Sequence, residues 1–101
     1  MITMHPGEYL AMAYIVPMGI TQSRLAKHLQ VDRSSVSRLL NCEADLTPNM
    51  AVRLSLVFDL SAEAWMEMQT QHSLKAEKRR FEGQKFEPLT VQEVEEDHAV
   101  A

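Results

Sequence analysis

The sequence predicts an all-α fold: a domain of five helices followed by an acidic tail. Only three Gly and four Pro occur among 101 residues, and the Val, Ile and aromatic residues do not alternate as they would in strands. Apolar residues instead recur at helical spacing. We expect one domain over residues 1–80, because this length leaves no room for a second core, and a flexible or partner-ordered tail over residues 81–101.

The first helix is expected after His5. Pro6 suits the first turn of a helix, where its missing N–H costs nothing. The apolar residues that follow at helical spacing are Leu10, Ala13 and Tyr14. Pro17 is predicted to end the helix, and Gly19 marks the turn beyond it.

Two short helices are expected next, over residues 22–29 and 33–41. Thr21 and Asp32 are of the type that caps a helix N-terminus. The apolar stripes are Leu25, Ala26, Leu29, Val36, Leu39 and Leu40. Two helices joined by so short a turn are typical of a helix-turn-helix, whose second helix meets the edges of DNA bases.

The last two helices have clear starts. Thr47 followed by Pro48 predicts a helix that continues to Asp59, and Leu46 before it is expected to be a buried anchor. Ser61 begins the fifth helix, which ends in the cationic stretch KAEKRR. Trp65 is expected to anchor the core beneath this helix. From residue 81 onward, no regular helical pattern is evident.

The net charge of −4 is unevenly distributed. Residues 81–101 carry one Lys against six acidic residues, whereas residues 21–41 carry four basic residues against Asp32 alone. Affinity for phosphate depends on the local field at the contact surface. The overall acidity therefore does not exclude binding of nucleic acid by residues 21–41.

The candidate DNA-binding residues lie on the outer face of the third helix. Arg33, Ser34, Ser37 and Arg38 have no apolar partners of their own, and the two arginines are offset by about 140° around a helix. One can reach base edges while the other lies nearer a phosphate. Gln22, at the start of the second helix, can hold a phosphate. The same spacing also occurs in helical domains that bind no DNA.

No pattern of a catalytic or metal site is present. The four histidines have no partner at helical spacing and Cys42 is the only cysteine, so we expect no metal, cofactor or disulfide. No nucleophile–base arrangement or phosphate loop appears, so an enzyme is not expected. With no membrane-spanning run and no signal peptide pattern, the chain is expected in the cytoplasm.

The chain resembles the HigA branch of bacterial antitoxins within the Xre/Cro-type, lambda-repressor-like helix-turn-helix family. The resemblance covers residues 5–80 and rests on HPGEYL (5–10), LTPNMAVRLSLVF (46–58) and AEAWMEMQTQHSL (62–74). It implies a homodimer that binds a palindromic operator, represses its own operon and neutralises a RelE-like mRNA-cleaving toxin of the HigB type. It also implies base contacts by Arg33, Ser34 and Arg38, and phosphate or secondary contacts by Gln22, Ser35 and Ser37.

The chain departs from the family pattern at two positions. Gln30, in the turn, and Cys42, after the third helix, stand where Gly is usual. A left-handed backbone at a non-Gly residue costs roughly 1 kcal/mol. Two other functions stay open at this point: a stand-alone Xre/Cro-type repressor without a toxin, and a helical protein-interaction module without DNA binding.

Overall fold

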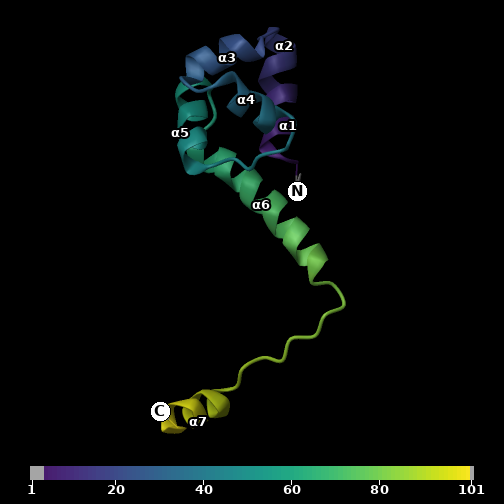
Figure 1. Cartoon of the computed structure of the whole chain (residues 1–101), viewed down its shortest axis with the longest axis vertical. Coiled ribbons are helices and arrows are strands. Elements are labelled where there is room, and N and C mark those ends of the chain that lie inside the picture. The colour runs from purple at the N-terminus through teal and green to yellow at the C-terminus, as the bar shows by residue number, and fades with distance from the viewer. Residues whose placement is uncertain (1–3, 101) are drawn as a thin grey trace.

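The computed structural model describes residues 4–100, with side chains described up to residue 95. It confirms the all-α fold and the five-helix domain with its helix-turn-helix (Figure 1). The elements are α1 (Pro6–Leu10), the π-helical η1 (Ala11–Ile15), α2 (Val16–Met18), α3 (Gln22–Leu29), α4 (Arg33–Leu40), α5 (Pro48–Val57), α6 (Ala62–Arg80) and α7 (Val91–Val100). The first three form one continuous helix.

The first helix passes through Pro17, so the prediction that Pro17 ends it was wrong. The turn before the proline widens into a π-helix, in which the Val16 N–H donates to the Ala11 carbonyl. Such a turn moves the carbonyls that a proline ring would otherwise meet, and it removes the need for the proline N–H. The helix ends one residue later, at Met18, and is followed by Gly19, whose backbone is left-handed (φ 61°).

Trp65 lies at the centre of the core, fully buried, as the sequence predicted. The rings of Tyr9 and Tyr14 lie 5.6 and 6.1 Å from its ring. The predicted anchor Leu46 is also buried, together with Leu10, Leu25, Ala26, Leu29, Val36, Leu39, Ala51 and Leu54. The apolar faces of the helices therefore meet in one core. This core fixes the positions of the helices and so of their outer faces.

The loop between α4 and α5 is tied to the core by Gln69 of α6. Its buried side-chain oxygen accepts a hydrogen bond from the Leu46 N–H (2.6 Å), and its amide nitrogen donates to Asp45 (3.3 Å) and Ser73 (2.9 Å). A buried amide with its hydrogen bonds made stabilises the arrangement it joins. Gln69 thus holds the part of this loop that leads into α5.

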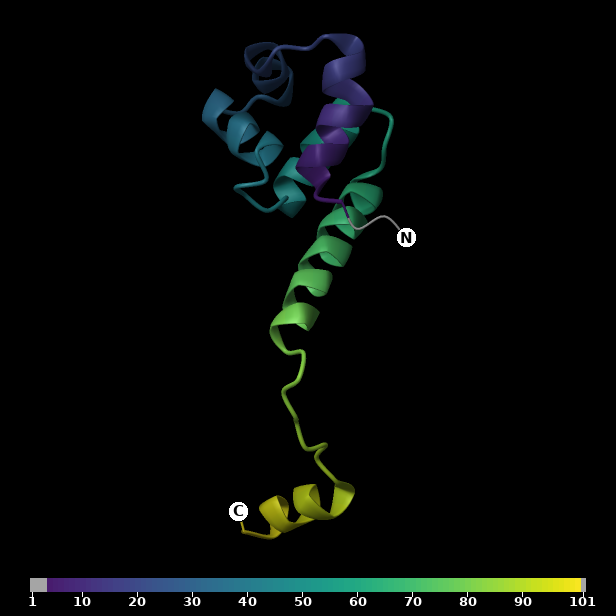
Figure 2. The same ribbon diagram turned by 90° about the vertical axis from the view of Figure 1, so that its right-hand side faces the viewer.

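The C-terminal segment contains a helix that the helical periodicity of the sequence did not predict. α7 begins with a reciprocal capping box: Thr90 Oγ1 accepts from the Glu93 N–H, and Glu93 Oε2 accepts from the Thr90 N–H, both at 3.2 Å. This T-x-x-E pattern is a sequence signal for a helix start. It lies in residues 81–101, for which the sequence analysis predicts a flexible or partner-ordered tail. α7 lies apart from the domain, at the end of an extended linker (Figures 1 and 2).

His5 caps the first helix and is itself buried. Its Nδ1 accepts a hydrogen bond from the Gly7 N–H (2.9 Å), and only 2% of the residue is exposed. The His72 ring lies 5.0 Å away, edge to face, so the fold brings together two histidines that are distant in sequence. Burial, and next the neighbouring His72, lower the pKa of His5 below its ordinary value of 6.5.

The stability of the domain is therefore expected to depend on pH through His5. Because its pKa is lower in the folded state, the unfolded chain binds more protons, and stability falls as pH drops below about 6.5. Asn caps a helix equally well but does not titrate, so His5→Asn is expected to lose less stability than wild type between pH 7.5 and 5. Urea unfolding at both pH values measures this. Equal losses in the two proteins would exclude His5 as the source.

Candidate nucleic-acid interface

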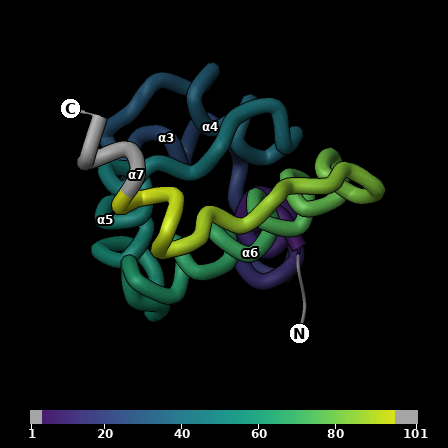
Figure 3. The backbone as a smooth tube through the Cα atoms, turned by 90° about the horizontal axis from the view of Figure 1, so that it is seen from below, coloured from purple at the N-terminus to yellow at the C-terminus, as the bar shows by residue number. Residues whose placement is uncertain are grey.

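α3 and α4 form the helix-turn-helix, on the side of the domain away from α6 (Figures 2 and 3). Thr21 caps α3 as predicted, its Oγ1 accepting from the Arg24 N–H (3.1 Å). Asp32 is the N-cap residue of α4, as predicted, but its side chain makes no capping hydrogen bond. The backbone carbonyl of Asp32 already accepts from the Ser35 N–H (3.1 Å), which removes one donor a cap would use.

The turn between the two helices is held by a residue that the sequence patterns did not reveal. Arg53 of α5 donates from one guanidinium nitrogen to the carbonyls of Leu29 (2.8 Å) and Gln30 (3.3 Å), and from Nε to Asn49 (2.8 Å). A cation at these carbonyls satisfies acceptors that the end of α3 leaves free. No local sequence signal could reveal it, because Arg53 follows the turn by more than twenty residues.

Both departures from the family's glycines adopt the left-handed backbone. Gln30 has φ 59° and Cys42 has φ 60°. The conformations expected for Gly thus persist with other residues in place. At Gln30, the hydrogen bonds from Arg53 to the turn help to maintain the conformation despite its cost.

Replacing Gln30 with Gly is expected to stabilise the domain by about 0.5–1 kcal/mol, because relief of the left-handed strain exceeds the entropy that Gly adds to the unfolded chain. The backbone carbonyls that Arg53 contacts remain in this variant. The matched control is Gln71→Gly inside α6, which is expected to destabilise by roughly 1 kcal/mol. Chemical denaturation of the three proteins measures both changes. A Gln30→Gly variant less stable than wild type would contradict the strain at this turn.

The outer face of α4 presents the predicted residues at different depths. Arg33, Ser34 and Arg38 are exposed, whereas Ser35 and Ser37 are half-buried. On the inner face of the same helix, the exposed fractions of Val36 and Leu39 are 1% and 3%. Gln22, half-buried, is the first residue of α3. Arg33, Ser34 and Arg38 are thus exposed on a helix whose inner face is fixed by the apolar core.

Ser35 lies toward α5. Together with Arg38, it lines a shallow hollow that continues over Thr47 and Met50. Ser37 accepts a long hydrogen bond from the Asn41 side chain (3.5 Å). The structure thus places Ser35 beside the loop that follows α4, and Arg38 between this loop and the open face.

A second basic surface lies along α3. Arg24, Lys27 and His28 are exposed and line a hollow with Gln30. The charge count of residues 21–41 included Arg24 and Lys27, but their position relative to α4 could not be predicted from spacing. They extend the positive charge from α4 across the first helix of the motif, where a DNA backbone would pass.

Gly7 fixes the distance between α1 and α4. A Cβ at this position would overlap the carbonyl oxygen of Leu39 and lie 2.9 Å from its carbonyl carbon. The start of the first helix therefore packs directly against the last turn of α4. Each of the first three residues of HPGE thus has a structural role. His5 caps the helix, Pro6 is its first residue, and Gly7 lets the helix approach α4.

Other kinds of site find no support in the described residues. Within residues 4–95, whose side chains the structure describes, no three His, Cys, Asp or Glu side chains gather as metal ligands would. Cys42 lies 3.9 Å from Glu8, and burial, with this carboxylate, raises the pKa of its thiol. No helix of that same range is long and apolar enough to cross a membrane.

The helix-turn-helix family HTH_3 matches residues 12–65, more than half of the chain. The chain belongs to this helix-turn-helix family. It is 37% identical to virulence-associated protein I of Dichelobacter nodosus, over 74% of this chain and 69% of that protein. As a helix-turn-helix protein similar to regulators and antitoxins, the chain is not an enzyme.

Two solved helix-turn-helix structures confirm the resemblance to HigA antitoxins. The antitoxin GraA superposes with a TM-score of 0.82 at 28% identity, covering 88% of this chain and 99% of GraA. Pseudomonas aeruginosa antitoxin HigA, solved with the higBA promoter, superposes with a TM-score of 0.76 at 31% identity, covering 88% and 100%. The whole fold of these antitoxins is thus present in the chain.

Proposed function

We propose that this helix-turn-helix protein is the DNA-binding antitoxin of a type II toxin–antitoxin module. It binds a palindromic operator, represses its own operon and neutralises a RelE-like mRNA-cleaving toxin of the HigB type. The observation that carries the proposal is the exposed cationic face of α4, set on buried Val36 and Leu39. The likeness to an antitoxin solved with its promoter supports it.

In this proposal the side chains divide into base-reading and backbone-positioning groups. Arg33, Ser34 and Arg38 contact bases in the major groove, since the exposed side chains of the second helix enter it. Gln22, at the N-terminus of α3, holds a phosphate with its side chain and the free backbone N–H groups of that helix end. Ser35 and Ser37, being half-buried, make secondary or phosphate contacts at the rim.

We assign DNA binding to residues 1–80 and keep the acidic tail, residues 81–101, outside the DNA contact. The tail carries a net charge of −5 and would be repelled by phosphate. We expect the toxin to be the product of the neighbouring gene. The surface of the chain that binds it is to be mapped by experiment.

The dimer required by a palindromic operator is proposed to form through α5. Val52 and Leu56, one helical turn apart, are 50% and 80% exposed on this helix, whose Arg53 contacts the turn before α4. An apolar pair in this position is suited to a contact between two copies. The two α4 helices would then enter successive major grooves about 34 Å apart.

Leu56→Glu is expected to convert the dimer to monomers and to weaken operator binding at least tenfold, because a charge would be buried at the contact and two-site binding would be lost. The matched control, Leu74→Glu, alters another exposed leucine on α6 and is expected to leave the dimer intact. Analytical ultracentrifugation and operator titration measure the two effects. A dimeric Leu56→Glu protein would exclude this interface.

The experiment that tests the function has a DNA arm and a toxin arm. DNA from upstream of the gene is titrated with the chain at 50 to 300 mM salt; the logarithm of the affinity is expected to fall steeply and linearly with the logarithm of salt concentration. A flat response near zero affinity favours a protein-interaction module. In the second arm, the neighbouring gene is expressed with and without the chain. Growth arrest relieved by the chain supports the antitoxin, and operator binding without rescue supports a stand-alone repressor.

A further inference from the structure

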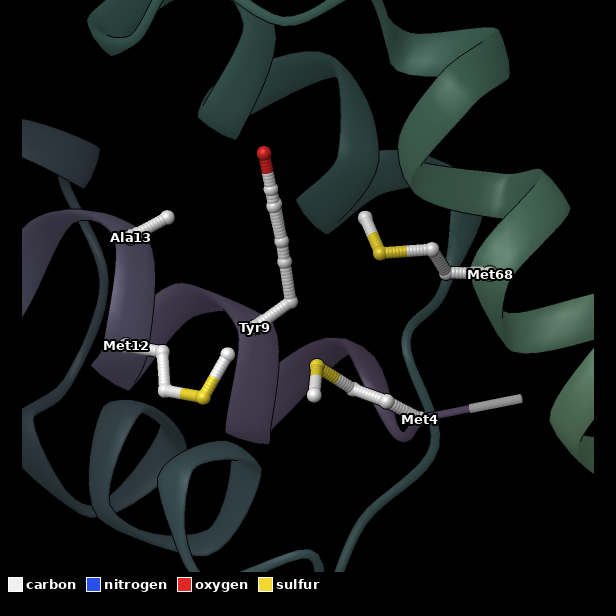
Figure 4. Close-up of a pocket in the computed structure, with 5 residues that line it drawn as sticks. All are labelled: Met4, Tyr9, Met12, Ala13 and Met68. Carbon is white, nitrogen blue, oxygen red and sulfur yellow. The ribbon is translucent and has the colours of Figure 1, made fainter. Parts of the chain in front are cut away.

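An apolar cavity of about 430 Å³ opens on the side of the domain formed by the first helix and α6. Its lining is Met4, Tyr9, Met12, Ala13 and Met68. Figure 4 shows Met68 of α6 on one side of the Tyr9 ring and Met12 of η1 on the other. A cavity of roughly 150 Å³ suffices for benzene, so this one admits one or two apolar side chains. Methionine-rich linings of this kind adapt to the group they receive.

A basic strip of α6 leads from this cavity toward the tail. Lys75, Lys78 and Arg79 line a shallow hollow on the last turns of the helix, together with Gln71, Leu74 and Glu82. At 100° per residue, Lys75 and Arg79 lie within about 20° of the direction of Met68 around the helix. Lys75 and Arg79 therefore lie on the same side of α6 as Met68, and Lys78 lies about 80° away. Glu82 is the one acidic residue of the strip.

The tail has the complementary composition. Phe86 and Leu89 are 70% and 68% exposed in the linker before α7. They flank Glu87 in the sequence FEPL and follow Gly83, whose backbone is left-handed (φ 82°) and lies in the turn that ends α6. The segment thus carries apolar side chains beside an acidic one. These are complementary in polarity to the apolar cavity and in charge to the basic strip.

We propose that the tail segment 86–89 folds back along α6 of its own chain and inserts Leu89 into the methionine-lined cavity. The lengths agree. Met68 is fifteen residues before Gly83, about 22 Å at the helical rise, and the six residues from Gly83 to Leu89 span about 20 Å when extended, so the Leu89 side chain covers the remainder. Phe86, about 10 Å from Gly83, and Glu87 after it come over the basic strip. In Figures 1 and 2 the tail is extended, and the Phe86 ring lies 5.5 Å from the Phe81 ring, a contact that docking would replace.

The test uses the full-length chain labelled with ¹³C in its methionine methyl groups. In wild type, the Met12 and Met68 methyls are expected to show nuclear Overhauser contacts to Leu89, and Leu89→Ser to remove these contacts and shift both methyl signals. The Met50 methyl, on α5, is expected to stay unchanged. Gln84→Ser, a polar change in the same linker, is the matched control and is expected to leave all three signals in place.

Charge and connectivity are tested in the same samples. Lys78→Glu combined with Arg79→Glu is expected to move the Met12 and Met68 signals toward their positions in Leu89→Ser, as high salt should also do. A sample that mixes labelled and unlabelled chains separates the two origins of a contact. Contacts within one chain support the proposal. Contacts only between chains, which would make a second copy the occupant, overturn it, and so does an absence of any contact to Leu89.

Discussion

Gly7→Ala is expected to destabilise the domain by about 3 kcal/mol or more, although alanine favours a helix by up to about 1 kcal/mol over glycine. The two effects have opposite signs, and the structure decides between them. The new methyl group would overlap the backbone of Leu39, which cannot rotate away as a side chain would. The first helix and α4 would have to separate, and the core between them would open. Thermal or urea unfolding measures the change.

Gly19→Ala is the matched control for this prediction. Gly19 has a left-handed backbone, but no atom lies within 4 Å of the place that an alanine Cβ would take. Only backbone strain of about 1–2 kcal/mol is therefore expected there. The loss at Gly7 should exceed the loss at Gly19. A Gly7→Ala protein as stable as wild type would show that the two helices do not approach as closely as described.

Arg33→Ala and Arg38→Ala are each expected to weaken operator binding by about 1–3 kcal/mol, roughly 5- to 150-fold. Both arginines are exposed on the outer face of α4, away from the core, so folding stability should be unchanged. Replacing an arginine that reads a base should also relax the sequence preference at its position. Replacing an arginine that contacts a phosphate should weaken binding to all sequences equally. Operator titration with matched and mismatched DNA separates the two roles.

The control for the arginines is Arg79→Ala. Arg79 is equally exposed, lies on α6 away from the helix-turn-helix, and its replacement removes the same charge from the protein. The affinity of this variant for the operator is expected to stay within about twofold of wild type, because Arg79 lies in the last turn of α6, outside the proposed interface, and salt screens exposed charges over about 8–10 Å. If Arg79→Ala weakened binding as much as Arg33→Ala, a general charge effect would replace the assigned interface.

Local signals in the sequence were sufficient to predict most helix starts and the motif. Thr21, Thr47 and Ser61 cap the helices they precede, because a hydroxyl before an apolar-periodic segment has its donor groups close by in the chain. The left-handed turns at Gln30 and Cys42 followed from the family pattern. The exposed face of α4 followed from the spacing of its apolar residues.

Contacts between distant segments could not be predicted. Arg53 at the turn, Gly7 against Leu39, and the His5–His72 pair each join residues more than twenty positions apart, and no periodicity reports such pairs. One local prediction also failed for a physical reason: Pro17 does not end the first helix, because a π-helical turn accommodates it. Asp32 holds the predicted N-cap position of α4, but without a capping hydrogen bond from its side chain.

DNA recognition by α4 is tested most directly by selecting binding sites from a random DNA library. Wild type is expected to enrich a palindrome whose half-sites are centred about 34 Å apart, roughly ten base pairs. Arg33→Ala or Arg38→Ala should lose the preference at one symmetric pair of positions and keep the remainder. DNA recognition by α4 would be contradicted if wild type enriched no sequence. It would also be contradicted if both variants enriched the wild-type sequence with unchanged preference.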